Sequence, residues 1–139
     1  MIRGEITRER LIPVIDISEI ADSLKKLVNI FEENFPRRED DILANAERQT
    51  AVGNAITTIY WYVVKGYNAY IKLLYVDAVI DVIYRWRVPF KQLVFEGNEV
   101  QFVKPLVIPS EKMLVLEMTN TGVDQDVDIL ITGWGRKVG

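Results

Sequence analysis

Three aspartates near the C-terminus have the residue type and spacing closest to a metal site in this chain. Asp124, Asp126 and Asp128 alternate, so in an extended segment their carboxylates share one face, and clustered carboxylate oxygens are the ligands that Ca²⁺ requires. The EF-hand pattern is not met, because Ile129 stands where that loop needs Gly and Gly135 stands where it needs Glu. We interpret the three aspartates as solvated charges that discourage pairing at a strand edge, and we expect no metal and no cofactor.

Most catalytic chemistry is excluded by composition. The chain has no Cys and no His, which removes thiolate and imidazole ligands, Cys nucleophiles and His-based triads. Carboxylates could still pair for glycoside hydrolysis, but no pair has a spacing that sets a working separation, and surface solvation explains them better. These carboxylates lie on or near predicted strands: Asp77, Asp81, Glu96, Glu99 and Glu117. No Gly-rich phosphate loop is present, and we expect a protein that is not an enzyme.

The charge balance and the N-terminus limit the partners. The net charge of -3 comes from 17 Lys and Arg against 20 Asp and Glu, which supplies no broad positive field, so we expect no nucleic-acid partner. Residues 1–5 carry charges where a signal peptide needs an apolar stretch, and no run approaches about 18 uncharged apolar residues. We expect a soluble protein without export processing and without a membrane partner.

Aromatic residues gather in the middle of the chain, where they could form an interface or a sugar-binding surface. Strand alternation should bury about half of them, and the exposed ones suit a subunit interface more often than a glycan. The group comprises Tyr60, Trp61, Tyr62, Tyr67, Tyr70 and Tyr75. From it we assign Trp61 and Tyr67 to a predicted interface.

A second interface candidate is the run from residue 84 to residue 87. Alternation along a strand places Tyr84 and Trp86 on one face and Arg85 and Arg87 on the other. The two kinds of side chain therefore cannot form one interleaved stacking surface for nucleic acid. We expect Tyr84 and Trp86 in the core, with Arg85 and Arg87 facing water or a partner subunit.

An amphipathic helix is predicted over residues 17–34. Its apolar positions recur at steps of three and four. Leu24, Leu27 and Phe31 lie on the apolar face, which we expect to pack against a partner surface. Asp16 is a suitable N-cap, and Pro36 blocks continuation of the helix. The preceding residues form an expected extended arm, because Pro13 interrupts any helix there. The arm residues assigned to the interface are Leu11, Ile12, Val14 and Ile15.

The rest of the chain is predicted to form a β domain. Residues 37–54 could form a short helix or an irregular crossing, so we divide the chain into an arm and helix (1–54) and a sandwich domain (55–139). Seven Val-, Ile- and aromatic-rich runs follow, at 56–64, 70–76, 80–88, 92–95, 100–103, 113–119 and 127–132. Close turns favour antiparallel connections, so we expect a jelly-roll-like antiparallel β-sandwich.

The last part of this β domain resembles the closing strands of small viral β-sandwich proteins. The resemblance lies in residues 102–109, a Pro-flanked strand, in 114–122, which ends in Asn-Thr-Gly, and in 127–133. It implies a part such as the capsid decoration or head-fibre proteins of tailed phages and archaeal viruses. We therefore expect a homo-oligomeric structural protein of the virion that also contacts a capsid protein. The alternative is a carbohydrate-binding module.

Overall fold

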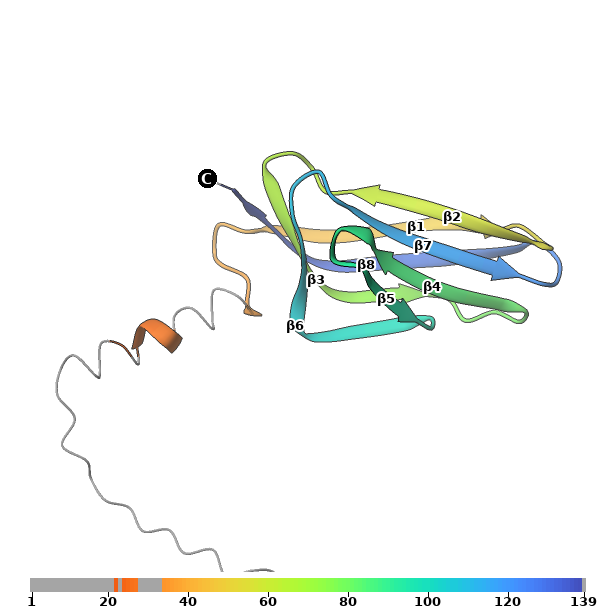
Figure 1. Cartoon of the computed structure of the whole chain (residues 1–139), viewed down its shortest axis with the longest axis horizontal. Coiled ribbons are helices and arrows are strands. Elements are labelled where there is room, and N and C mark those ends of the chain that lie inside the picture. The colour runs from red at the N-terminus through yellow and green to blue at the C-terminus, as the bar shows by residue number, and fades with distance from the viewer. Residues whose placement is uncertain (1–21, 23, 28–33, 139) are drawn as a thin grey trace, which may run out of the picture.

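The computed structural model describes residues 22, 24–27 and 34–138 (Figure 1). Residues 22, 24–27 and 34 are helical, which agrees with the helix predicted over 17–34. The remainder of that segment lies outside the described residues. So do the predicted interface positions of the arm: Leu11, Ile12, Val14 and Ile15.

The described residues form eight strands. They are β1 (Asp41–Ala51), β2 (Ala55–Tyr62), β3 (Tyr67–Val76), β4 (Val82–Val88), β5 (Leu93–Glu96), β6 (Glu99–Ile108), β7 (Met113–Asn120) and β8 (Gln125–Lys137). The 3₁₀ turn η1 (Pro89–Lys91) joins β4 to β5. The seven predicted runs correspond to β2 through β8, with shifted ends.

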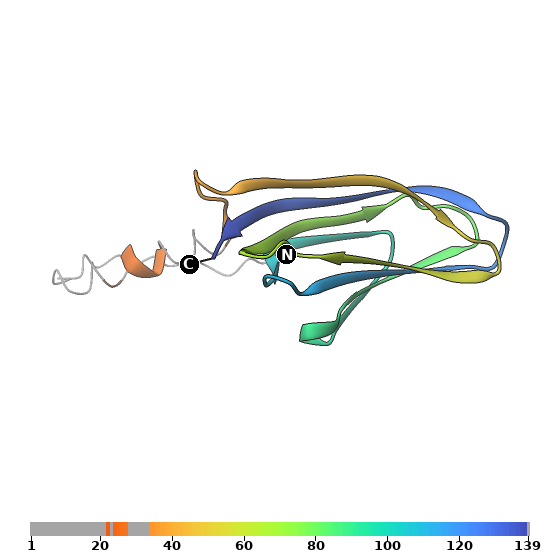
Figure 2. The same ribbon diagram turned by 90° about the horizontal axis from the view of Figure 1, so that it is seen from above.

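The strands form two four-stranded sheets with the orders β1-β8-β3-β6 and β2-β7-β4-β5. Every paired strand is antiparallel to its neighbour, and the sheets lie as two layers face to face (Figure 2). This interleaved order, with neighbours that come from both halves of the chain, is the jelly-roll arrangement. The predicted antiparallel β-sandwich is confirmed.

The first strand is the main departure from the sequence prediction. We expected residues 37–54 to form a short helix or an irregular crossing, but β1 pairs with β8 from Asp41, opposite Gly135, to Ala51, opposite Gln125. Its Ala, Asn, Glu and Gln residues have low strand propensity, so pairing with β8 and inward packing of Leu43 and Ala51 determine the conformation. The sandwich therefore begins ahead of residue 55, where the sequence placed its start.

The core lies between the sheets and follows the strand alternation. The largest fully buried side chains include Trp86, Leu74, Ile108 and Met118. Tyr84 is also buried, so the predicted core positions of Tyr84 and Trp86 are confirmed. A bulge at residue 72 of β3 shifts the register against both β6 and β8. β8 keeps its alternation through this region, which leaves Trp134 and Arg136 on the outer side of their sheet.

Candidate functional site

An apolar cavity of about 530 Å³ lies between the sheets, where the edge strands β1 and β2 face each other. Its walls include Ile42 and Leu43 from β1, Ile71 from β3, Leu114 from β7 and Ile131 from β8. The volume falls within the range of small-molecule sites, roughly 300–1,000 Å³. The cavity could not be predicted from the sequence, because one of its walls is β1, whose strand conformation the sequence pattern did not indicate.

Trp61 and Tyr67, which the sequence assigned to an outer interface, both line this cavity. The Trp61 indole Nε1 donates a hydrogen bond to Glu47 Oε1 at 2.6 Å, and its ring stacks on Trp86 with centroids 6.1 Å apart. Glu47 lies on β1 and Trp61 on β2, so this bond joins the two edge strands across the gap between the sheets. An interface role for either aromatic residue would therefore involve the cavity.

A second candidate surface is the outer face of the β2-β7-β4-β5 sheet. We call its exposed members, Ile56, Tyr60, Tyr62, Ile83 and Val94, the apolar sheet face. Their exposed fractions run from 44% for Val94 to 68% for Ile83. Ile56 and Ile83 both lie opposite Thr119 of β7, so that pair sits on one row across the sheet.

Arg85 and Arg87 lie on the same outer face, as the sequence predicted. Arg87 and Tyr60 both lie opposite Val115, which is fully buried although it points outward. Arg87 forms an ion pair with Glu117, and Arg85 is exposed between Glu96 and Glu117 in the strand register. The orientation of both arginines is confirmed, and their contact with a partner stays a prediction.

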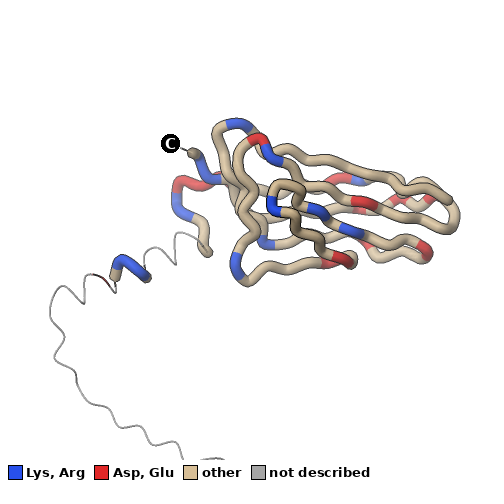
Figure 3. Tube along the Cα trace, viewed as in Figure 1, with Lys and Arg blue, Asp and Glu red and all other residues tan. Residues whose placement is uncertain are grey.

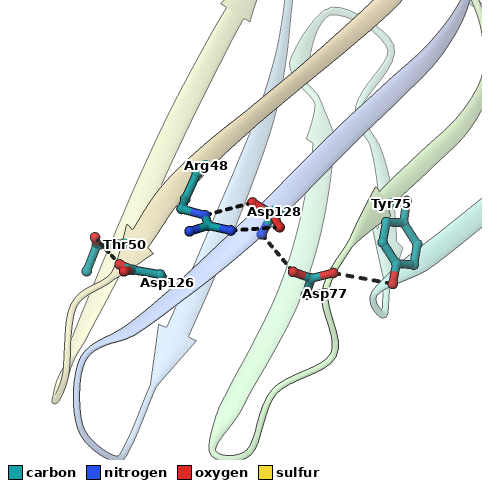
Figure 4. Close-up of polar contacts among 6 residues, drawn as sticks. All are labelled: Arg48, Thr50, Tyr75, Asp77, Asp126 and Asp128. Carbon is teal, nitrogen blue, oxygen red and sulfur yellow. Dashed lines mark hydrogen bonds and ion pairs between the residues drawn. The ribbon is translucent and has the colours of Figure 1, made fainter.

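The three aspartates near the C-terminus take part in polar contacts within the protein. Arg48 on β1 donates from Nε to Asp128 Oδ1 at 2.9 Å, and the Thr50 hydroxyl donates to Asp126 Oδ1 at 2.7 Å (Figure 4). The Gly53 amide donates to Asp124 Oδ1 at 2.7 Å. We expected these residues at a strand edge, but β8 lies between β1 and β3. They stabilise cross-strand and turn contacts there.

Asp77 connects the loop after β3 to the same region. Its Oδ2 accepts a hydrogen bond from the Asp128 amide at 2.9 Å, as Figure 4 shows. Its backbone carbonyl accepts the Tyr84 hydroxyl. Burial, together with the negative charge of Asp77, raises the pKa of Tyr84 to about 12. Tyr84 therefore stays a neutral hydrogen-bond donor at physiological pH, and both residues have a structural role.

Residues 35–40, which lead into β1, are fixed by Arg136 to the outer face of the β1-β8-β3-β6 sheet. Its Nη2 donates to Asp40 Oδ2 at 2.8 Å and to the Phe35 carbonyl at 3.2 Å. Its guanidinium lies over the Tyr70 ring, 4.6 Å from the centroid, and Tyr70 in turn stacks on Trp134. This cluster determines where the N-terminal segment leaves the sandwich.

The charges of the described residues are mixed in sign along the strands (Figure 3). Within the part of the chain that the structure describes, no three Asp, Glu, His or Cys side chains come close enough together to hold a metal ion. Among the same residues, no helix is long and apolar enough to cross a membrane. Comparisons of this chain with protein-family models, with curated proteins and with solved structures give no match.

Proposed function

We propose that this protein is a non-enzymatic structural subunit of a virion, which binds copies of itself and a capsid protein. The observation that carries the proposal is the apolar sheet face. Three β-branched aliphatic residues and two tyrosines stand exposed on one side of one sheet. A row of polar residues that includes Glu117 and Arg85 lies between Ile56 and Ile83 on one side and Tyr60 and Val94 on the other. Exposed apolar side chains set among polar ones are typical of interaction surfaces on soluble proteins.

The chemistry of this face suits a protein partner. Tyrosine and arginine are enriched at the energetic centres of protein interfaces, and Tyr60 and Arg87 flank the same β7 residue. The Arg87–Glu117 ion pair holds the guanidinium along the sheet, so little side-chain freedom remains to be lost on binding. All of these residues lie on paired strands of one sheet, and this pairing sets their relative positions.

The viral assignment is supported by the resemblance of residues 102–133 to virion sandwiches and by the jelly-roll order of the strands. Jelly rolls form many viral capsid domains, but lectin domains and cupins use the same arrangement. The fold is therefore compatible with the proposal but does not distinguish a capsid protein from a lectin or a cupin. That distinction depends on the chemistry of the protein surface.

A carbohydrate-binding module is the second candidate, and one observation favours it. Tyr60 and Tyr62 are 53% and 67% exposed and point to the same side of β2, so their rings could stack on successive sugar units. A glycan array distinguishes the two functions. Specific sugar binding by a monomer supports the module, whereas an oligomer that binds no glycan supports the structural role.

The direct test is the mass in solution, measured by light scattering at micromolar concentration. We expect a homo-oligomer, and we expect the double variant Tyr60→Ser, Ile83→Ser to dissociate toward the monomer. Val103→Ser is the matched control, because Val103 is 96% exposed but lies on β6 of the other sheet. A monomeric wild type, or equal dissociation of the control, would contradict the proposal.

A further inference from the structure

We infer that the cavity between β1 and β2 receives residues 11–15 of a neighbouring copy of this chain. The inference rests on the proposed self-assembly and adds the contact by which the N-terminal arm takes part in it. It combines three observations: where the cavity opens, what lines it, and how the chain leaves the sandwich.

The cavity opens between two strands that each have a free side. β1 and β2 are the first strands of their sheets, so within the described residues each has a strand partner on one side only. An edge strand presents backbone N–H and C=O groups that can pair with an added extended segment. Every second side chain of such a segment would point toward the gap between the sheets.

The chemistry of residues 11–15 matches that opening. Their sequence, Leu-Ile-Pro-Val-Ile, has no charged or polar side chain, and the lining contributed by Ile42, Leu43 and Leu114 is apolar. Pro13 opposes a helix and is tolerated in an edge strand. In an extended chain, Leu11, Pro13 and Ile15 share one side, so three apolar groups can enter one cavity.

The path of the chain favours the cavity of a neighbour over its own. Arg136 fixes residues 35–40 to the outer face of the β1-β8-β3-β6 sheet, whereas the cavity lies on the inner face. Residues 22 and 24–27 lie beyond the end of the sandwich (Figures 1 and 2), with Leu24 and Leu27 56% and 52% exposed. Among the described residues, neither residues 35–40 nor residues 22 and 24–27 line the cavity, so we assign it to the arm of a neighbouring copy in the proposed assembly.

Disulfide crosslinking tests this contact cleanly, because the natural chain has no Cys. One copy carries Ile15→Cys, on the side of the arm that enters the cavity, and a second carries Val64→Cys, which lies at the cavity and is 70% exposed. The two proteins are unfolded together, refolded as a mixture and oxidised. The matched control replaces the second protein with Val103→Cys, on an exposed position outside this cavity. We expect at least a tenfold higher yield of reducible heterodimer with Val64→Cys.

Equal yields from the two mixtures would overturn the inference. A double variant with Ile15→Cys and Val64→Cys in one chain provides a second test. If its disulfide forms only within the monomer, the arm binds its own cavity and the inference is wrong. Light scattering on the wild-type protein distinguishes this result from a failure of the proposed function. If the wild type is an oligomer but the crosslink does not form, only the arm contact is rejected. If the wild type is a monomer, the arm contact and the proposed self-assembly are both rejected.

Filling the cavity gives an independent test. Asn45 lines it from β1, and Asn45→Trp should reduce the crosslinking yield at least fivefold. Ala44→Trp is the control, because Ala44 is the neighbouring residue on the outward side of the same strand. A folded Asn45→Trp protein, judged by its melting temperature, that crosslinks as well as the control would also overturn the inference.

Discussion

The Arg136 guanidinium and the Asp40 carboxylate join the last strand to the residue that precedes the first. Arg136 donates from Nε to Oδ1 at 3.1 Å and from Nη2 to Oδ2 at 2.8 Å, and the two side chains are only 10% and 1% exposed. Burial alone would raise the pKa of Asp40. The hydrogen bonds from Arg136 and from the Arg37 amide outweigh burial and hold that pKa below its ordinary value.

Asp40→Asn should therefore lower the free energy of unfolding by about 2 kcal/mol at pH 7, because it removes hydrogen bonds to a charged group in a buried site. The effect depends on pH. Since the pKa of Asp40 is lower in the folded chain, the unfolded chain binds the proton first as pH falls. The contribution is complete above the ordinary pKa of about 3.9 and is lost as pH falls through the lower folded value.

Thermal melting between pH 7 and pH 2 checks this expectation. The difference between wild type and Asp40→Asn should shrink at the acidic end. Asp128→Asn is the control: its ion pair with Arg48 is exposed, so this substitution should lower the melting temperature much less than Asp40→Asn. If the difference in melting temperature between wild type and Asp40→Asn stays constant from pH 7 to pH 2, Asp40 contributes no such charge-dependent stability.

The sequence predicted those strands whose side chains determine their own conformation. The Val-, Ile- and aromatic-rich runs that became β2 to β8 carry both strand propensity and a buried face. β1 could not be recognised in this way. Glu47, Arg48 and Thr50 are satisfied only by partners elsewhere in the chain, namely Trp61, Asp128 and Asp126. Local pattern cannot show pairing between residues that lie so far apart.

Gly133 should be the least replaceable glycine of β8. A Cβ at this position would lie 1.8 Å from the Tyr70 carbonyl oxygen, so the backbones of β3 and β8 would have to separate. We expect Gly133→Ala to cost about 3 kcal/mol, at the upper end for overpacking. Gly135→Ala is the matched control two residues away, where the nearest atom is an ordinary 3.7 Å contact with the Tyr67 ring.

Chemical denaturation of the two glycine variants checks the expectation. The midpoint for Gly133→Ala should fall far below that of wild type, while Gly135→Ala should stay near it. Equal shifts for both variants would mean that β3 and β8 do not approach as closely as the structure shows.

Chelators and calcium should leave stability unchanged. Asp126 and Asp128 already accept hydrogen bonds from Thr50 and Arg48, and a cation would have to displace these donors. We expect the same melting temperature, within a degree or two, in EDTA and in millimolar CaCl₂. A fall of several degrees in EDTA would restore the calcium interpretation of the three aspartates.

The predicted interface residues show what strand alternation can and cannot establish. It correctly separated Tyr84 and Trp86 from Arg85 and Arg87, because those four residues lie on one regular strand. It could not place Trp61, since the exposed or buried side of β2 depends on which face meets the other sheet. The cavity itself requires β1, β2 and β3 together, so no local stretch of sequence carries its signal.

Removing residues 1–15 should weaken assembly while the sandwich still folds. All eight strands lie within residues 41–137, and the Arg136 contacts to Phe35 and Asp40 remain in the truncated chain. The core residues that the structure describes all lie after residue 40, and in the proposed assembly the arm adds contacts between subunits. The melting temperature at low protein concentration should therefore change by only a few degrees. Light scattering should show a shift toward smaller species at the same concentration.

A full-length variant with Leu11, Ile12, Val14 and Ile15 all replaced by Ser should behave like the deletion, because it loses the apolar contacts but keeps the length. A truncated protein that assembles as well as the intact one would show that the arm has no role in assembly, and one that fails to fold would place residues 1–15 within the folded domain.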